Sequence, residues 1–161
     1  MAVLRAKWEP ATFEEKLIFN YSLNNPGIFF LEVPVGNSAY GKWPKKSKIR
    51  RIDAINIKNS NSKNEIYSKK LFSYHDFKNR VSNKSVQLIE TKKKLNRFVI
   101  GQVIAGYDMF EREFNPQDIE MVVLCVEGDR ALEWVCKKRN IKIEKIDITP
   151  KEDEEVYIPL N

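Results

Sequence analysis

Val86-Gln87-Leu88-Ile89-Glu90-Thr91-Lys92 decides the fold, together with Arg51-Ile52-Asp53-Ala54-Ile55 earlier in the chain. Both stretches are rich in aliphatic and β-branched residues, which is typical of strands. Successive side chains of a strand point to opposite faces, so Glu90 and Lys92 share one face and Thr91 takes the other. If the two strands pair, the carboxylates of Asp53 and Glu90 and the ammonium of Lys92 converge on one spot.

Such a cluster is suited to a divalent metal. Carboxylates are the hard oxygen ligands that Mg²⁺ selects, and Mn²⁺ accepts the same ligands. A nearby lysine can orient a water molecule or offset negative charge that develops on a phosphate. We therefore predict a metal-dependent site for phosphate chemistry at Asp53, Glu90 and Lys92.

The hydrophobic pattern predicts the remaining elements. Helices are expected over residues 13–24, 98–114 and 128–140, a short helix within 71–81, and strands over 28–35, 49–57, 86–92, 121–126 and 141–148. Thr12 and Glu15 form a capping box that marks the start of the first helix. Gly101 and Gly106 weaken the helix at 98–114, so we expect both to pack closely on the sheet.

The order helix, three strands, helix, strand resembles the αβββαβ core of the PD-(D/E)xK nuclease superfamily, over about residues 13–148. Asp53 and the Glu90-x-Lys92 triplet match its motif, with Ile52 where the superfamily's proline stands. The resemblance implies an α/β fold with a mixed sheet flanked by helices, extended by a C-terminal helix and strand. It also implies that Asp53, Glu90 and the Thr91 carbonyl bind the metal, that Lys92 positions the attacking water, and that Gln102 reaches the site.

Two further carboxylates are second-tier candidates for the site. Glu14 lies on the same stripe of the first helix as its apolar residues, where many superfamily members carry an additional acid. A helix-end glutamate that interacts with the macrodipole is an equally good reading. Glu32 stands inside an apolar strand and needs a partner if it is buried, which Lys92, Arg51 or a metal could supply. A rim position on an edge strand is the alternative.

The composition limits the function classes. The 161 residues predict one domain, with residues 58–85 as an insertion between core strands. No apolar stretch is long enough for a membrane span and no signal peptide is evident, so we expect a cytoplasmic protein. Two cysteines and a single histidine, His75, cannot assemble a zinc site within one chain. Cys125 and Cys136 are expected as buried thiols.

The net charge of +6 favours a polyanionic partner, and the cations are clustered. The expected phosphate contacts come from two runs that flank the proposed metal site: Lys42, Lys45, Lys46, Lys48, Arg50 and Arg51, then Lys93, Lys94 and Arg97. Tyr40 and Trp43 lie among the first cations, where they could stack on bases or attach the loop to the core. Solvated lysine-rich loops are the alternative.

The leading hypothesis is a Mg²⁺- or Mn²⁺-dependent nuclease that hydrolyses phosphodiester bonds in DNA. RNA as a substrate and a homodimer are both compatible with the sequence. The alternative is a catalytically inactive nucleic-acid-binding or regulatory protein with the same fold. A third reading, a protein-interaction domain, would scatter the charged residues over the surface. The chain has no glycine-rich phosphate loop to support a nucleotide site.

Overall fold

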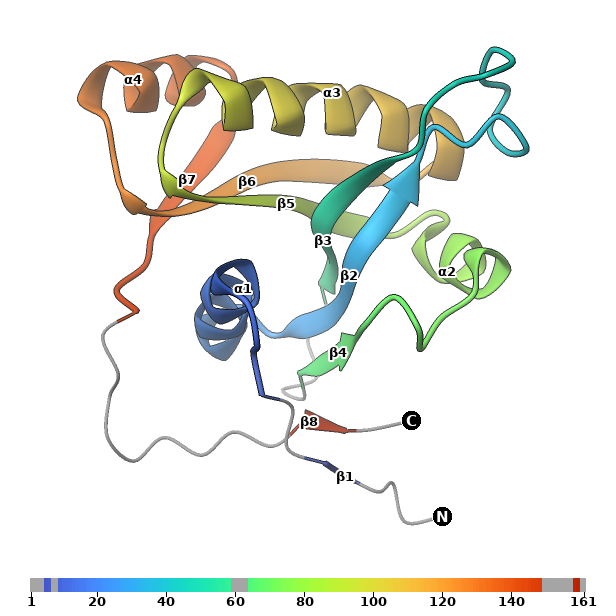
Figure 1. The fold of residues 1–161 in the computed structure, drawn as a ribbon, viewed down its shortest axis with the longest axis horizontal. Helices are drawn as coiled ribbons and strands as arrows, with labels where there is room; N and C mark the ends of the chain where they lie inside the picture. The colour runs from blue at the N-terminus through green and yellow to red at the C-terminus, as the bar shows by residue number, and fades with distance from the viewer. Residues whose placement is uncertain (1–4, 7–8, 59–63, 149–157, 160–161) are drawn as a thin grey trace.

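The computed structural model describes residues 5–6, 9–58, 64–148 and 158–159 (Figure 1). The elements in these ranges are β1 (Arg5–Ala6), α1 (Phe13–Asn24), β2 (Gly27–Val35), β3 (Arg50–Lys58), β4 (Glu65–Tyr67), α2 (Tyr74–Val81), β5 (Ser85–Lys94), α3 (Arg97–Phe114), β6 (Asp118–Glu127), α4 (Arg130–Lys138), β7 (Ile141–Lys145) and β8 (Ile158–Pro159).

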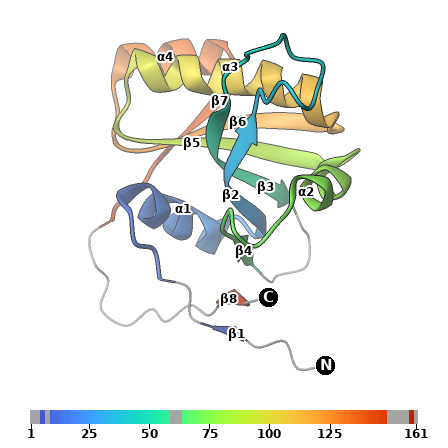
Figure 2. The same cartoon turned by 45° about the vertical axis from the view of Figure 1, so that its right-hand side comes forward.

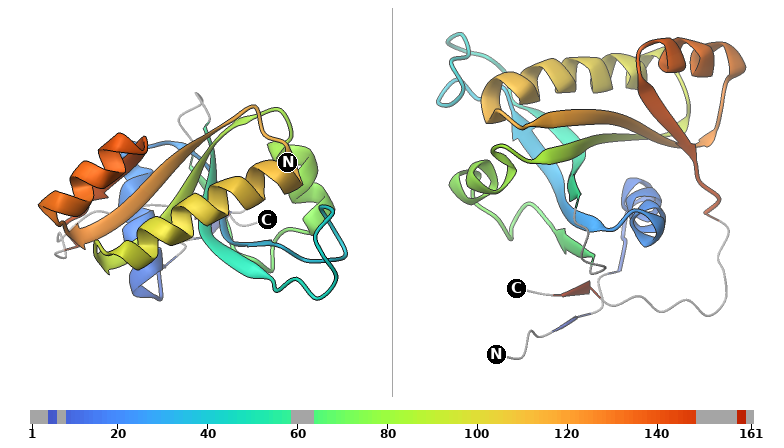
Figure 3. Two further views of the ribbon diagram at one scale, coloured as in Figure 1. Left: turned by 90° about the horizontal axis from the view of Figure 1, so that it is seen from above. Right: turned by 180° about the vertical axis from the view of Figure 1, so that it is seen from behind.

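Six strands form one mixed sheet in the order β4-β2-β3-β5-β6-β7. The pairs β2–β3 and β3–β5 are antiparallel, whereas β5, β6 and β7 run parallel and β4 runs parallel to β2. Helices α3 and α4 cover one face and α1 lies on the other (Figures 1 and 3). The predicted α/β class and the αβββαβ order are therefore confirmed, as α1, β2, β3, β5, α3 and β6. The additional C-terminal helix and strand are α4 and β7.

The two faces of the sheet bury two separate cores. The core on the α3 side includes Leu88, Val103, Phe110 and Val123. The core on the α1 side includes Leu17, Ile18, Ile89 and Val122. Strand β6 contributes to both, which explains why its central residues form a continuous apolar run.

Local signals fix the helix ends. The Thr12 hydroxyl accepts the Glu15 N–H at 3.1 Å, and the Glu15 carboxylate accepts the Thr12 N–H, so the predicted capping box is confirmed. Asn96 caps α3 by accepting the Val99 N–H, which places the helix start one residue earlier than expected. Asp129 caps α4 in the same way. The side chains satisfy backbone donors that have no partner within a helix.

Strands β2 and β3 both change faces at one place. Leu31 belongs to the α1-side core, yet Val33 belongs to the α3-side core, although strict alternation would put them on one face. Between them Glu32 has a φ of 51°. On β3, Ala54 belongs to the α1-side core and Ile52 to the α3-side core, with Asp53 between them. The positive φ of a non-glycine residue thus accompanies a local rotation of both strands beside the candidate site.

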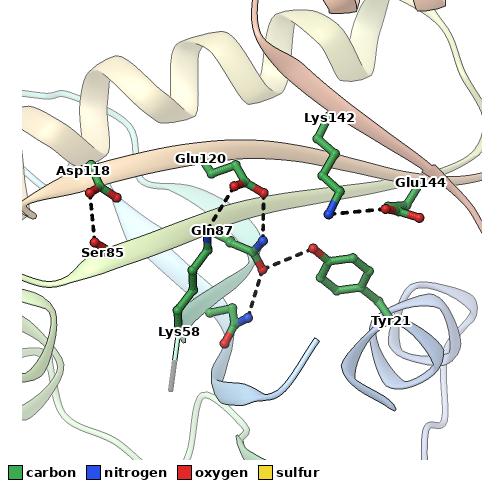
Figure 4. A network of polar contacts seen from close by, with 9 residues as sticks. Tyr21, Lys58, Ser85, Gln87, Asp118, Glu120, Lys142 and Glu144 are labelled. Atoms are coloured by element: carbon green, nitrogen blue, oxygen red, sulfur yellow. Dashed lines mark hydrogen bonds and ion pairs between the residues drawn. The ribbon is translucent and has the colours of Figure 1, made fainter. Parts of the chain in front are cut away.

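Helix α1 is attached to the sheet by a polar network (Figure 4). The Tyr21 hydroxyl and the Asn56 amide both donate to the Gln87 side-chain oxygen, at 3.2 and 2.9 Å. The Gln87 amide donates to Glu120, which also pairs with Lys58 at 3.0 Å. Because Asn56 and Gln87 are buried, these hydrogen bonds fix the position of α1 against the sheet.

The insertion at 58–85 contributes to the sheet as well as carrying a helix (Figure 2). Helix α2 confirms the short helix expected there, and Phe77 packs on Phe110 and Phe114 of α3. Strand β4 was not predicted, because three residues are too few for a periodic pattern. Residues 59–63 of the predicted loop lie outside the described residues, as does the acidic tail at 149–157.

The burial of two cysteines and the packing at two glycines test further predictions from the sequence. Cys125 and Cys136 are buried free thiols, as predicted. Gly106 packs on Leu88, where an added Cβ would meet its methyl groups at 3.5 Å. Gly101 contradicts the prediction of close packing, since a Cβ there would meet nothing within 4 Å. No helix in the described part of the chain is long and apolar enough to cross a membrane.

Candidate active site

The carboxyl groups of Asp53 and Glu90 contact each other where β3 and β5 separate. The two strands pair from Ile57–Val86 to Ala54–Ile89, and Asp53 and Glu90 are the next residues in this register. Glu90 is 3% exposed. The predicted convergence of these two carboxylates from neighbouring strands is therefore present, and the separation of the strands provides the space for it.

Thr91 holds Asp53 in place. Its N–H and its hydroxyl both donate to Asp53 Oδ2, each at 2.8 Å. The carboxylate thereby accepts the Thr91 N–H, which a backbone carbonyl of β3 would accept in a regular ladder. Because the N–H and C=O of one strand residue point to the same neighbouring strand, the Thr91 carbonyl is also directed toward β3.

Burial and mutual repulsion govern the charge of the pair. Burial raises the pKa of Glu90 to about 9, and the negative charge of Asp53 adds to the increase. Burial also raises the pKa of Asp53, which the hydrogen bonds from Thr91 partly offset and the charge of Glu14 reinforces. Glu90 therefore carries a proton at neutral pH, which relieves the repulsion between two close carboxylates.

Two cavities lie on either side of this pair. Glu90 lines a groove of about 620 Å³ between α3 and the start of β3, with Gln102 and the arginines Arg50, Arg51 and Arg97. Asp53 lines a second cavity of about 470 Å³ on the α1 side. We name these the arginine groove and the acidic cavity. The acid pair thus connects a cation-rich space with an anion-rich one.

Lys92 lies on the same side of β5 as Glu90, as predicted. Its Nζ is 5.4 Å from the centroid of the Phe98 ring, and Phe98 lines the arginine groove. Gln102 lines the same groove from the second turn of α3. Gln102 thus lines the groove together with Glu90, whereas Lys92 lies beside the groove, near the ring of Phe98.

Glu14 and Glu32 both line the acidic cavity with Asp53, but their surroundings differ from the prediction. Glu14 was expected on the buried face of α1 and is exposed. Glu32 is exposed too, which favours the alternative of a rim position, and it pairs with Lys69 of the insertion at 3.4 Å rather than with Lys92 or Arg51. Arg51 contacts only the Glu32 backbone carbonyl, at 3.4 Å. The strand rotation at Glu32 turns its side chain out of the core.

The predicted cations are exposed and divide into two groups. Arg50, Arg51 and Arg97 line the arginine groove, and Lys93 and Lys94 follow Lys92 at the end of β5. The others, Lys42, Lys45, Lys46 and Lys48, lie on the loop 36–49 between β2 and β3. Figure 3 shows this loop beside the C-terminal end of α3.

The aromatic residues of loop 36–49 anchor it, which is the second of the two readings offered by the sequence. Trp43 Nε1 donates to the buried Glu113 carboxylate at 2.6 Å, and the Gly36 N–H donates to the same oxygen at 3.0 Å. Tyr40 stacks on Tyr74 with ring centroids 3.9 Å apart. These contacts hold the loop against α2 and α3.

Sequence reasoning missed three residues at the cavities. Lys69 and Lys70 line the acidic cavity from the insertion, whose aperiodic sequence gave no hint of their position. Phe98 belongs to an apolar stripe of α3, and such a stripe does not distinguish a ring that lines an open groove from one that packs in the core.

The acid pair supplies two carboxyl groups as candidate ligands. Within the ranges that the structure describes, no group of three or more His, Cys, Asp or Glu side chains is arranged to hold a metal ion. Mg²⁺ commonly binds through one or two carboxylates and keeps several water molecules. The acid pair with the Thr91 carbonyl therefore fits a hydrated Mg²⁺ or Mn²⁺ and does not fit a fully protein-coordinated metal.

Comparison with known proteins assigns this chain to no family. The sequence matches no protein-family model, and no curated protein matches it. Among solved structures, it is similar to the crystal structure of a repair endonuclease from Pyrococcus abyssi, with 12% identity and a TM-score of 0.45. The alignment covers 88% of this chain and 50% of that protein, so the chain spans about half its length.

Proposed function

We propose that this chain is a divalent-metal-dependent nuclease of the PD-(D/E)xK type, which hydrolyses phosphodiester bonds in DNA. The observation that carries the proposal is the contact between the Asp53 and Glu90 carboxyl groups at the opening between β3 and β5, beside a groove lined by three arginines. Structural acid pairs of this kind are rare, because burying two carboxyl groups costs free energy that folding alone does not return.

Asp53, Glu90 and the Thr91 carbonyl are the proposed ligands of Mg²⁺ or Mn²⁺. A divalent cation would replace the proton that Glu90 carries and offset the repulsion within the pair. When bound, such a metal lowers the pKa of its water and stabilises charge on a phosphate oxygen. The buried position of Glu90 would keep this chemistry away from bulk solvent.

The remaining roles fall to side chains of the arginine groove, to Lys92 beside it and to two acids of the acidic cavity. The guanidinium groups of Arg50, Arg51 and Arg97 would bind phosphate oxygens, which arginine does with paired hydrogen bonds. Lys92 would orient the attacking water or offset charge on the phosphate. Gln102 would contact the substrate or this water. Glu14 and Glu32 would act from the acidic cavity, on the other side of Asp53.

A second candidate function is a catalytically inactive DNA-binding protein. Its support is that Asp53 already receives two hydrogen bonds from Thr91 and that the described residues contain no three-ligand cluster. The exposed cations would serve binding in either case. A homodimer and RNA as a substrate are compatible with both functions.

Digestion assays test the proposal directly. Linear, circular, single-stranded and branched DNA are incubated with the protein in Mg²⁺, in Mn²⁺ and in EDTA. The proposal expects cleavage with either metal and none in EDTA or with Asp53→Asn. DNA binding without cleavage of any substrate in either metal would favour the inactive binding protein.

A further inference from the structure

Phe98 has an exposure that its residue type rarely shows. Its side chain is 67% exposed, the largest value among the exposed large hydrophobic residues of the described chain. It stands on the first turn of α3, with Lys92 Nζ 5.4 Å from its ring centroid. An exposed aromatic face beside a groove is available to stack on the ring of a ligand.

The arginine groove beside Phe98 is open and apolar along α3. Gly101, Ala105 and Met109 line it from successive turns of the helix. A side chain at Gly101 would meet no protein atom within 4 Å, so this part of the groove is empty space. Its volume of about 620 Å³ lies within the range of small-ligand pockets. The groove therefore has room for a flat ring next to Phe98.

Positively charged side chains border the groove, as the binding of a nucleotide's phosphate requires. Arg97 adjoins Phe98, and Arg50 and Arg51 lie across the groove on β3. An aromatic face bordered by cations is the arrangement with which proteins bind single-stranded nucleic acid, the base on the ring and the phosphates on the cations. Glu90 lines the same groove, which places such a base beside the proposed scissile phosphate.

We propose that Phe98 and the arginine groove bind an unpaired base of DNA, and that the substrate is therefore DNA with unpaired nucleotides. This inference rests on the proposed nuclease site for the position of the cleaved bond. In an intact duplex the bases are stacked on one another and cannot reach Phe98 unless one is extruded, which costs unstacking and unpairing. Single strands, ends and unpaired junctions present a base without that cost.

Binding measured in EDTA tests this proposal without relying on cleavage. Fluorescence anisotropy compares a labelled single strand with the blunt duplex of the same sequence. The wild type is expected to bind the single strand more tightly. Phe98→Ala should weaken single-strand binding by about 5- to 140-fold, the range expected when one base–aromatic stack is removed, and should change duplex binding much less. Phe98→Tyr keeps the ring and should retain the single-strand affinity.

Two further variants separate the groove from general effects. Trp134→Ala removes another exposed aromatic residue, 64% exposed with Lys138 5.3 Å from its ring, which does not line the groove. It should leave both affinities unchanged. Gly101→Leu fills the empty space and suits a helix better than glycine, so a decrease in single-strand binding there would not reflect unfolding.

The outcomes distinguish this inference from the proposed function. Equal decreases in affinity for both DNAs with Phe98→Ala, or no decrease with Phe98→Ala and Gly101→Leu, would overturn the unpaired-base site even in an active nuclease. A Phe98-dependent preference for the single strand, in a protein that cleaves nothing in Mg²⁺ or Mn²⁺, would support the base site and reject the nuclease.

Discussion

Asp53 and Glu90 occupy opposite positions on β3 and β5, one residue beyond the last regular pair, and their carboxyl groups contact each other. The contact lies where the pairing of β3 with β5 ends, so the acid pair borders a cavity on each side of the sheet. Thr91 compensates for the missing ladder hydrogen bonds by donating twice to Asp53. The site is thus built from a local defect in the sheet.

Removing either acid should stop cleavage without unfolding the protein. Asp53→Asn and Glu90→Gln each delete a ligand charge, so metal-dependent cleavage should fall to background while DNA affinity is largely kept. Thermal stability at neutral pH without metal should hold or rise slightly, because Glu90 is already protonated and Asp53→Asn removes a buried charge. Cleavage assays and melting curves in EDTA provide the measurements. Glu144→Gln, a carboxylate on β7, is the control. Full activity of either variant would remove the proposed ligands from the site.

Metal-free stability should decrease as pH rises. The folded pKa of Glu90 is about 9, above the ordinary glutamate value of 4.5. Between these two values the unfolded chain loses its proton while the folded protein keeps it, so the free energy of unfolding falls by at most about 1.4 kcal/mol per pH unit. Urea denaturation in EDTA at pH 5, 7 and 9 measures this slope.

Glu90→Gln serves as the matched variant for that slope. Its amide does not titrate, so its stability should change less with pH than that of the wild type over the same range. Mg²⁺ should stabilise the wild type more at pH 9 than at pH 5, because binding competes with the proton. Parallel slopes for the two proteins would contradict a raised pKa at Glu90.

Lys92→Ala should lose most of the turnover and retain metal binding. A protonated amine has no lone pair for the metal, so the lysine acts on water and phosphate alone. Calorimetric titration with Mn²⁺ and single-turnover cleavage separate the two effects. Lys138→Ala is a suitable control, because Lys138 also lies over an exposed aromatic ring, that of Trp134. Wild-type turnover in Lys92→Ala would reduce the Glu90-x-Lys92 motif to a surface feature.

The loop lysines should contribute to DNA affinity through phosphates only. Replacing Lys42, Lys45, Lys46 and Lys48 with Gln should flatten the dependence of log affinity on log salt by roughly 0.9 for each duplex phosphate that is no longer neutralised. Base preference should stay the same, since phosphate contacts carry no sequence information. A salt titration followed by anisotropy measures both. Substitution of Lys78, Lys84, Lys137 and Lys138 removes equal charge elsewhere, and identical slopes for the two quadruple variants would exclude the loop from DNA binding.

The hydrogen bonds that Glu113 accepts should hold loop 36–49 in its observed conformation. It is 4% exposed and accepts hydrogen bonds from Gly36, Trp43 and Tyr74. Glu113→Ala removes the oxygen that accepts the Gly36 N–H and the Trp43 Nε1–H, which leaves these donors without that partner and should cost about 1–3 kcal/mol. Urea denaturation measures the decrease in stability, and hydrogen exchange at the Gly36 amide should accelerate. Exchange at an unchanged rate would mean that the loop is held by other contacts.

The sequence alone determined the order of the elements and the proximity of Asp53 to Glu90. Periodicity is a local property, so a period of two or 3.6 residues identifies a strand or a helix without knowledge of its neighbours. Pairing of two adjacent strands then brings Asp53 and Glu90 together. The capping box at Thr12 and the buried thiols at Cys125 and Cys136 were predictable for the same reason, because each depends on residues close in sequence.

Only the tertiary structure decided what surrounds the acid pair. Glu32 leaves the core because β2 rotates at a positive φ, which an alternating apolar pattern does not encode. Glu113 meets Gly36 across 77 positions of the chain, and Lys69 reaches Glu32 from an aperiodic insertion. Phe98 and Gly101 fit the pattern of a packed helix, yet they line an open groove that follows one face of α3 as far as Met109, while Val99 on another face is buried. These contacts arise from packing between distant segments, which local sequence patterns do not specify.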